Sequence, residues 1–364
     1  MDEALHQRAA AGVRLPRPKA YNNRYGRVNA MRTKQLGSSG LEVPVVSVGC
    51  WSFGGGAEDY WGQQDQGDVN ALVDMALDLG VNYFDTAYGY NEGNSERSLG
   101  EALKGKRQRA LICDKTPVQA NAQLFEDKLV EALKRLQTDY VDVLMIHWPV
   151  QDQELLATNL LALDSACKKG YVRFAGVSNF GVKTMELARE LGVKVVANEF
   201  AYSLLSRGPE LNVVPYCQQH GIGITSYMSL MQGVLTGKYD SIEDIPPRRR
   251  RTVQFDGLKN PLVGQAHATP PAEDEVMEVL RVLKRLAPEC RMSVSQLALA
   301  WCLDKPAMAT AIVGCRNTSQ LLENMQAADA ALDAGVVAEL DRASQGVLDK
   351  MGGTLDIFGR DRIW

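Results

Sequence analysis

Four polar side chains follow three apolar runs that are typical of buried β-strands. Asp85 comes directly after the first run, and Tyr90 lies five residues further on. Lys115 ends the second run, and His147 follows the third. In a chain of alternating strands and helices, the carboxyl ends of parallel strands share one rim of a barrel, where such folds carry out chemistry. The sequence therefore predicts a site that combines a carboxylate, a phenol, an ammonium group and an imidazole.

These groups together could protonate a carbonyl oxygen. A tyrosine has a reference pKa of about 10, and a neighbouring ammonium group stabilises the phenolate and lowers that pKa. Lys115 can supply the ammonium group, and Asp85 can keep it charged and in place. His147 offers an N–H to a carbonyl that approaches Tyr90. Each residue alone has an ordinary structural explanation, so it is their combination that favours catalysis, and the site then lacks only a source of hydride.

Composition narrows the class of protein. The chain has 364 residues, 45% of them hydrophobic, and a formal net charge of −4, which is ordinary for a globular protein. This charge gives no reason to expect nucleic acid or an anionic membrane as a partner. The four histidines are far apart, which argues against a metal site and hence against a metal-dependent hydrolase. Seven scattered cysteines without a CxxC motif indicate a reducing compartment such as the cytoplasm.

Residues 1–30 differ from the rest because they are basic and lack apolar periodicity. We expect a disordered leader there, with organelle import as the open alternative to a cytoplasmic location. No apolar stretch in the chain approaches the ~20 residues needed to span a bilayer.

The pattern from Met31 onward predicts a short hairpin around 37–40 and then eight strands alternating with amphipathic helices. The strand candidates are 45–49, 81–84, 110–113, 141–146, 174–177, 195–197, 223–226 and 310–313, and helices include 68–79, 121–136 and 181–191. Apolar strands alternating with helices predict a parallel sheet, and eight strands can close it. We therefore expect a single (α/β)8 TIM barrel over 31–364, with an N-terminal β-hairpin and a C-terminal helical extension.

Two segments depart from a simple barrel. The segment 230–271, after the seventh strand, is long and rich in proline, glycine and arginine, as functional barrel loops often are. The tail from Asp333 adds a helix and a terminal stretch that could fold over the barrel mouth. A doubly wound dinucleotide fold is rejected because CWSFGGGAEDYWG, after the first strand, lacks the GxGxxG spacing.

At this point the chain resembles the aldo-keto reductases. The motifs that carry the resemblance are DTAYGYNEGNSERSLGEAL, CDKTP, IHWP and GVSNF, and they occur in this order between about Met31 and at least Asp329. GVSNF, SYMSLMQGVLTGKY and VGCRNTSQLLEN are most similar to the bacterial branch with sugar- and inositol-acting members. The resemblance implies a metal-free barrel that transfers hydride reversibly between NADP(H) and a carbonyl, which would be an aldehyde, a ketone or a keto sugar.

The resemblance also implies roles for individual residues. Tyr90 would be the general acid and base, and Lys115 the partner that lowers its pKa. Asp85 would hold Lys115, and His147 would orient the carbonyl. The residues implied in cofactor binding are Trp51, Ser178, Asn179, Glu199, Tyr227, Ser229, Leu230, Gly233, Lys238, Gly314, Arg316, Gln320, Glu323 and Asn324.

Among these cofactor residues, Ser178 and Asn179 would bind the nicotinamide carboxamide, and Tyr227 would stack on its ring. Arg316 would lie near the adenosine 2′-phosphate, which favours NADP(H) over NAD(H) because a guanidinium pairs with phosphate bidentately. The basic run 248–251 is interpreted as a solvated loop that could also help hold the phosphates.

Two cofactor residues depart from the family pattern. Glu199 stands where glutamine is usual, and a carboxylate can accept from the carboxamide NH2 but cannot donate to its oxygen. Its negative charge would favour the cationic, oxidised ring, so we hypothesise that Glu199 tilts the protein toward alcohol or sugar oxidation. Ser229 stands near a position where proline is frequent. We have no mechanism that links this change to the choice of substrate.

We expect a substrate pocket lined by Trp51, Tyr60 and Trp148. Phe358 and Trp364 in the tail are further candidates for this wall. Such a wall suits an aromatic aldehyde or the flat face of a sugar, although core packing would explain the tryptophans equally well. A small-molecule substrate is the expected partner, and the sequence makes no prediction of oligomeric state.

The alternative function is an NADP(H)-binding regulatory subunit that works by protein contact, as related barrels do in channel complexes. The four filled catalytic positions argue against a purely structural role.

Overall fold

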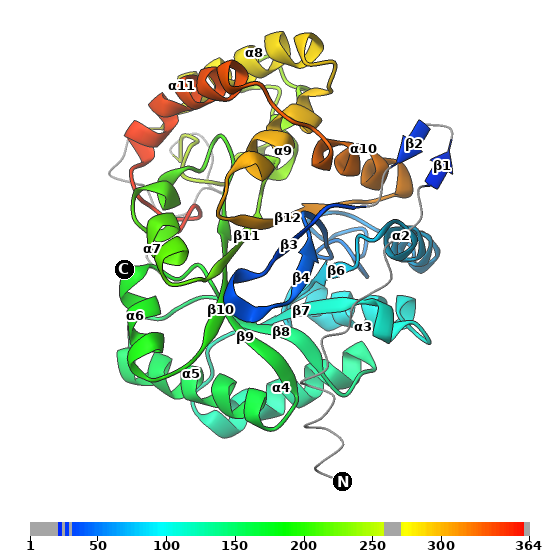
Figure 1. The fold of residues 1–364 in the computed structure, drawn as a ribbon, viewed down its shortest axis with the longest axis vertical. Helices are drawn as coiled ribbons and strands as arrows, with labels where there is room; N and C mark the ends of the chain where they lie inside the picture. Colours follow the sequence, from blue (N-terminus) through cyan, green and yellow to red (C-terminus); the bar gives the residue numbers. More distant parts are fainter. Residues whose placement is uncertain (1–20, 24–25, 29–30, 258–270, 360–364) are drawn as a thin grey trace.

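In a computed structural model the chain forms a closed barrel of eight parallel strands (Figure 1). The structure describes residues 21–23, 26–28, 31–257 and 271–359. The barrel strands are β5 (Val46–Gly49), β6 (Tyr83–Asp85), β7 (Leu111–Thr116), β8 (Val141–Ile146), β9 (Val172–Ser178), β10 (Val195–Ala201), β11 (Gly223–Tyr227) and β12 (Met308–Gly314). Parallel pairing of β12 with β5 closes the ring. The predicted (α/β)8 barrel is confirmed.

Helices surround the barrel on its outer side (Figure 1). They are α2 (Gln66–Leu79), α3 (Asn94–Ala102), α4 (Ala122–Leu136), α5 (Gln153–Lys168), α6 (Val182–Glu190), α7 (Val213–Gln219), α9 (Val294–Asp304) and α10 (Thr318–Ala328). Capping side chains set several helix starts, and at α4 the Asn121 side chain accepts from the Leu124 backbone N–H at 2.9 Å. No helix in the described ranges combines the length and apolarity that crossing a membrane would need.

The predicted N-terminal hairpin is present as β3 (Thr33–Gln35) and β4 (Glu42–Pro44), joined through η1 (Gly37–Ser39). Leu36 and Val43 are fully buried in a cluster that includes residues at the starts of the barrel strands. Gly37 has φ +56°, and a Cβ there would lie 2.5 Å from the Gly221 carbonyl oxygen, so no larger residue fits. The hairpin therefore closes the amino-terminal end of the barrel and leaves the opposite end for a site.

Six residues of the expected leader are described, and they form an antiparallel pair of β1 (Tyr21–Asn23) and β2 (Gly26–Val28). Figure 1 shows β2 beside α10. The expected disorder of the leader stays a prediction, because 1–20, 24–25 and 29–30 lie outside the described residues.

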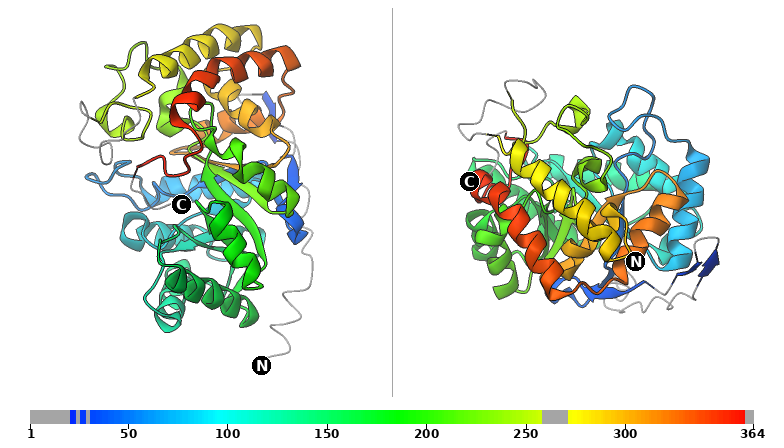
Figure 2. Two further views of the ribbon diagram at one scale, coloured as in Figure 1. Left: turned by 90° about the vertical axis from the view of Figure 1, so that its left-hand side faces the viewer. Right: turned by 90° about the horizontal axis from the view of Figure 1, so that it is seen from above.

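The long segment after β11 contains two short 3-10 helices, η5 (Met231–Thr236) and η6 (Pro247–Arg249), and then a long helix, α8 (Glu273–Glu289). It is α9, not α8, that packs on the barrel strand β12, whereas α8 packs against the C-terminal helix α11 (Ala334–Met351). Figure 2 shows α8 and α11 side by side outside the barrel. The C-terminal helical extension is thus confirmed, and its pairing with α8 is an addition that the sequence pattern did not predict.

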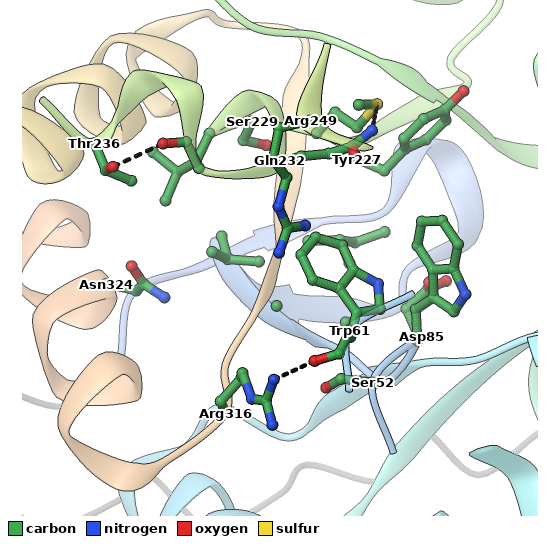
Figure 3. A pocket seen from close by; sticks show the side chains of 18 of the residues that line it. Ser52, Trp61, Asp85, Tyr227, Ser229, Gln232, Thr236, Arg249, Arg316 and Asn324 are labelled. Atoms are coloured by element: carbon green, nitrogen blue, oxygen red, sulfur yellow. Dashed lines mark hydrogen bonds between the residues drawn. The ribbon is translucent and has the colours of Figure 1, made fainter. Parts of the chain in front are cut away.

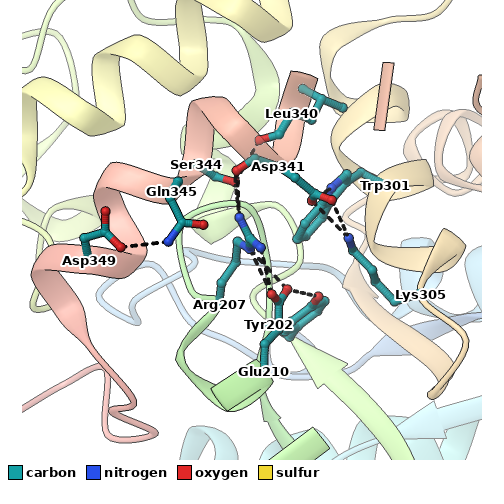
Figure 4. Close-up of polar contacts among 10 residues, drawn as sticks. All are labelled: Tyr202, Arg207, Glu210, Trp301, Lys305, Leu340, Asp341, Ser344, Gln345 and Asp349. Carbon is teal, nitrogen blue, oxygen red and sulfur yellow. Dashed lines mark hydrogen bonds and ion pairs between the residues drawn. The ribbon is translucent and has the colours of Figure 1, made fainter. Parts of the chain in front are cut away.

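A polar network holds α11 against the rest of the molecule (Figure 4). Arg207 forms an ion pair with Glu210 at 2.8 Å and donates to the Asp341 carbonyl oxygen, also at 2.8 Å. The Asp341 carboxylate accepts from the Trp301 indole N–H at 2.8 Å and from the Lys305 ammonium at 3.0 Å. The Arg207 side chain is only 9% exposed, so losing its partner would leave a buried charge uncompensated.

We expect Glu210→Gln to destabilise the protein by about 1–3 kcal/mol, because the buried guanidinium loses a charged acceptor. Urea unfolding of the variant measures this loss. Gln345→Ala is the control, since Gln345 bonds only to an exposed Asp349 in the same helix, and we expect no more than about 0.5 kcal/mol there. Equal stability of wild type and Glu210→Gln would contradict this assignment.

Candidate active site

A cavity of about 730 Å³ opens at the carboxyl ends of the barrel strands (Figure 3). Its lining contains most residues that the sequence indicated: Trp51, Asp85, Tyr90, His147, Trp148, Asn179, Glu199, Tyr227, Ser229, Leu230, Gly233, Lys238, Gly314, Arg316, Gln320, Glu323, Asn324 and Phe358. Lys115 and Ser178 are buried beneath the cavity surface. Tyr60 stacks on Trp51, and Trp364 lies outside the described residues.

Lys115 is fully buried, and two carboxylates share its ammonium group. Its Nζ lies 2.6 Å from each carboxylate oxygen of Asp85 and 3.3 Å from Oε1 of Glu199. It also donates to the Thr86 carbonyl oxygen at 3.0 Å. Because β8 and β9 separate β7 from β10 in the sheet, the contact with Glu199 crosses the barrel interior. All three polar partners are themselves buried. Their ion pairs and hydrogen bond compensate the ammonium group for its removal from water.

Tyr90 lies directly against this cluster. The Lys115 Nζ is 5.3 Å from the centre of the Tyr90 ring, and the His147 ring meets the same ring edge-on at 5.8 Å. The Trp51 ring also stacks on Tyr90, with ring centres 5.6 Å apart. Asn91 connects the loop after β6 with the loop after β5, since its side-chain amide donates to the Trp51 carbonyl oxygen at 2.8 Å. The structure therefore brings the four predicted catalytic residues together.

The pKa of Tyr90 differs from the sequence expectation. Lys115 lowers it, but burial raises it more, and the nearby carboxylates of Asp85 and Glu199 raise it further. The net direction is upward, so the expectation of an unusually acidic phenol is wrong for the protein by itself. The main physical reason is that the phenol is removed from water, and because Lys115 divides its charge between two carboxylates, its ammonium group does not offset this effect. Sequence reasoning missed this second contact, because it placed Glu199 only beside the cofactor.

The residues expected around a nicotinamide form one hydrogen-bonded group. Asn179, at φ +62°, donates through its amide to Ser178 Oγ at 2.9 Å and to the His147 carbonyl oxygen at 3.2 Å. Its Oδ1 accepts from the Tyr227 hydroxyl at 2.7 Å. Both amide hydrogens are thus engaged, and Oδ1 keeps a second lone pair. This group ties together the ends of three barrel strands, β8, β9 and β11.

The other end of the cavity suits an elongated, negatively charged ligand. Lys238 and Arg316 line it as cations, and the Arg316 guanidinium is held by the carbonyl oxygens of Trp61 and Gln63. Figure 3 shows Arg316 reaching toward Trp61. At Gly314, a Cβ would meet no atom within 4 Å, so a ligand has room beside the backbone.

The basic run does not behave as a uniformly solvated loop. Arg249 and Arg251 line the cavity. The Arg249 guanidinium lies 4.1 Å from the Trp61 ring, and that of Arg251 lies 4.2 Å from the Tyr60 ring. Figure 3 shows Arg249 extending into the cavity toward Trp61. The solvated-loop interpretation is therefore wrong for these two arginines and holds for the exposed Arg248.

Ligand-type atoms of Asp85, Cys113 and Glu199 lie within 4.8 Å of one another in the described part of the chain. The ammonium of Lys115 already binds both carboxylates of this group, so a cation there would have to displace it.

A second pair of buried acids lies on the outer side of β7, behind Lys115. Both carboxylate oxygens of Asp114 and Oε1 of Glu96 are buried and have no hydrogen-bond partner among the residues that the structure describes, while Glu96 Oε2 accepts from Arg135 at 2.8 Å. Burial raises the pKa of both carboxyl groups, and the charge of Glu96 raises the pKa of Asp114 further, whereas Arg135 opposes the rise at Glu96. Arg135, with Glu131 on its other side, and Lys115 are the charged groups around them. We infer that the pair retains a proton, which supplies the missing donor.

A group that keeps its proton only in the folded state stabilises the fold below its ordinary pKa and loses that contribution as pH rises through the folded value. We therefore expect the free energy of unfolding to fall as pH rises above the ordinary aspartate range, and Asp114→Asn to reduce this fall. Urea unfolding across pH tests it, with the exposed Asp78→Asn as control. The same pH dependence in Asp114→Asn and wild type would contradict the inference.

Comparison with known proteins shows which family the chain belongs to. A family model described as the aldo/keto reductase family matches residues 45–345. The chain is 32% identical over 305 residues to the aldo-keto reductase YhdN of Bacillus subtilis, covering 80% of this chain and 87% of that protein. It is 31% identical over 317 residues to a probable voltage-gated potassium channel subunit beta of Arabidopsis thaliana, covering 82% and 92%.

Comparison with solved structures points to the same family. The structure of an aldo-keto reductase from Klebsiella pneumoniae in complex with NADPH superposes with a TM-score of 0.66 at 26% identity, covering 86% of this chain and 95% of that one.

Proposed function

We propose, from the premise that this chain belongs to the aldo/keto reductase family, that it is an NADP(H)-dependent oxidoreductase interconverting a carbonyl compound and its alcohol. The observation that carries the proposal is the contact of Tyr90 with Lys115 and His147 at the cavity floor. A phenol beside an ammonium group and an imidazole is suited to exchange a proton with a carbonyl oxygen.

The cavity residues fit the cofactor. NADP(H), when bound, supplies or accepts a hydride at the nicotinamide ring. Lys238 and Arg316 would hold its phosphate groups, because a polyanion needs cations around it. The free lone pair of Asn179 Oδ1 would accept from the carboxamide, and Tyr227 would lie against the ring. The complex of the Klebsiella pneumoniae structure with NADPH supports this choice of cofactor.

Each catalytic side chain has a separate task in the reducing direction. Tyr90 donates its phenolic proton to the carbonyl oxygen, and His147 orients that oxygen by hydrogen bonding. Lys115 stabilises the phenolate that remains. Asp85 and Glu199 hold Lys115 in place. A tyrosine with a reference pKa of about 10 is protonated at neutral pH, as a proton donor must be.

Tyr90→Phe tests this assignment with a generic aldehyde, 4-nitrobenzaldehyde, and NADPH. We expect a fall in kcat of roughly 100- to 10,000-fold, the range for loss of a general acid. Lys115→Met should lower kcat as well, because the phenolate loses its cation. Tyr88→Phe is the matched control, since the Tyr88 hydroxyl bonds to Glu131 on the outer helix α4. Full activity in Tyr90→Phe would rule out the proposed role.

Glu199 should influence the direction of the reaction. Burial and the charge of Asp85 raise the pKa of Glu199 itself, while the Lys115 ammonium favours its charged form. In that form the carboxylate raises the pKa of Tyr90 and brings negative charge toward a nicotinamide ring. We therefore expect Glu199→Gln to weaken NADP⁺ binding relative to NADPH by roughly tenfold, as for one pKa unit of interaction. It should also shift the rising limb of the oxidation rate to lower pH, because a less basic Tyr90 loses its proton sooner.

Fluorescence titration gives the two cofactor affinities, and initial rates give the pH profile. Glu92→Gln is the control, because this carboxylate lies two residues from Tyr90 but is exposed. An unchanged ratio of NADP⁺ to NADPH affinity would show that Glu199 has no such effect.

The alternative, a cofactor-binding regulatory subunit, draws support from the likeness to the Arabidopsis thaliana channel subunit. The same aldehyde assay separates the two functions: an enzyme turns over and loses activity in Tyr90→Phe, whereas a regulatory subunit binds cofactor with little turnover.

A further inference from the structure

We propose that Glu199 is a proton-exchanging residue of this site, which carries a proton when the nicotinamide ring is absent or reduced and releases it when NADP⁺ binds. The inference rests on the proposed function and adds to it a proton that follows the charge of the cofactor. It comes from the way in which two carboxylates share one ammonium group beneath the cavity.

The buried cluster has an excess negative charge if both of its carboxylates are ionised. Asp85 and Glu199 each contribute one negative charge, and Lys115 contributes one positive charge. All three residues are at most 3% exposed, so water does not stabilise the excess. An uncompensated charge in such surroundings is costly, and a buried carboxyl group generally avoids it by keeping a proton.

The geometry assigns this proton to Glu199 rather than to Asp85. Both carboxylate oxygens of Asp85 lie 2.6 Å from Nζ of Lys115, whereas Oε1 of Glu199 lies 3.3 Å from it. Oε2 of Glu199 accepts from the Thr225 hydroxyl at the long distance of 3.5 Å. A carboxylate oxygen of Glu199 also lies within 4.8 Å of one of Asp85, where two negative charges repel each other. Burial and then the charge of Asp85 accordingly raise the pKa of Glu199, although Lys115 opposes the rise.

The remaining ionisable groups around Glu199, in the part of the chain that the structure describes, are two phenols, a thiol and an imidazole. Burial raises the pKa of Tyr83, Cys113 and Tyr90, so these three groups stay neutral at neutral pH. The His147 imidazole meets the Tyr90 ring edge-on at 5.8 Å. The strands on either side, β9 and β11, present serine and threonine hydroxyls at the positions paired with Glu199. The positive charge in contact with Glu199 is thus an ammonium group that is already paired with another carboxylate.

Glu199 lies where a bound nicotinamide ring would change its charge state. It lines the cavity, and its backbone carbonyl oxygen accepts from the Asn179 N–H at 2.7 Å, beside the residues that we propose for the carboxamide. The ring of NADP⁺ is positively charged, and that of NADPH is neutral. A cation beside Glu199 supplies the charge that its carboxylate lacks, so the ionised form is favoured and the proton leaves.

Calorimetry of cofactor binding, in buffers of different ionisation enthalpy, counts the protons released and needs no turnover. We expect NADP⁺ to release roughly one proton more than NADPH at about pH 7, because Glu199 is still protonated in the free protein. NADPH is the matched control, since it carries the same phosphate groups. The affinity for NADP⁺ relative to NADPH should rise by up to roughly tenfold per pH unit below the pKa of Glu199 in the free protein.

Two variants identify the source of the proton. Glu199→Gln should abolish the difference between the two cofactors. It should still bind NADPH, because glutamine keeps the size of the side chain and leaves Asp85 and Lys115 paired. Tyr90→Phe should retain the difference, which excludes the phenol as the source. Glu92→Gln, at an exposed carboxylate two residues from Tyr90, should retain it as well.

Infrared difference spectroscopy gives an independent readout through the C=O stretch of a protonated carboxyl group. We expect this band to disappear when NADP⁺ binds to the wild type and to persist when NADPH binds. The change should be missing in Glu199→Gln. The proton that we infer between Asp114 and Glu96 lies behind β7, so its band cancels in the difference.

Equal proton release with both cofactors, or a difference that survives in Glu199→Gln, would overturn the inference and leave the proposed function intact. Loss of the difference in Tyr90→Phe would assign the proton to the phenol and would overturn the inference too. If neither cofactor binds, the proposed function fails, and the inference fails with it.

Discussion

The removal of the Lys115 ammonium group from water is the constraint on which the rest of the site depends. A fully buried cation must be compensated, and the protein does so with Asp85, the Thr86 carbonyl oxygen and Glu199. Because these partners come from β6, the loop after it and β10, the ion cluster exists only when the barrel is closed. Tyr90 lies against the same cluster, so its proton affinity reports the balance of all these charges.

The remainder of the fold directs access to that cluster from one side only. The β3–β4 hairpin closes the amino-terminal end of the barrel, with Leu36 and Val43 packed below the strands. At the other end, the long segment after β11 and the C-terminal tail form a wall together, since the Val253 backbone N–H donates to the Ile357 carbonyl oxygen at 2.8 Å. The polar network of Figure 4 fixes α11, which precedes the tail, to Arg207 after β10 and to Trp301 of α9.

Polar residues within strands explain why the apolar pattern predicted some strands that are shorter than those in the structure. The apolar run predicted a strand that ended near Cys113, yet β7 continues through Asp114 and Lys115 to Thr116. Likewise β10 continues from Ala197 through Glu199. The barrel can hold such buried polar residues because each has an opposite charge or a bound proton nearby, either across the barrel interior or on the outer side of the strand. Two arginines of the basic run, Arg249 and Arg251, also lie against aromatic faces, those of Trp61 and Tyr60.

The chain by itself determined the barrel and pointed to the four groups that we propose as catalytic. Strand and helix periodicity is local, and Asp85, Tyr90, Lys115 and His147 follow strands whose carboxyl ends must share a rim. Only the tertiary structure decided which carboxylates Lys115 would contact and how far Tyr90 would be buried, and burial is the main cause of the direction of the Tyr90 pKa. It also decided that Arg249 and Arg251 turn inward and that α8 joins α11. These outcomes depend on contacts between residues distant in sequence, and no local pattern of residue types encodes such distances.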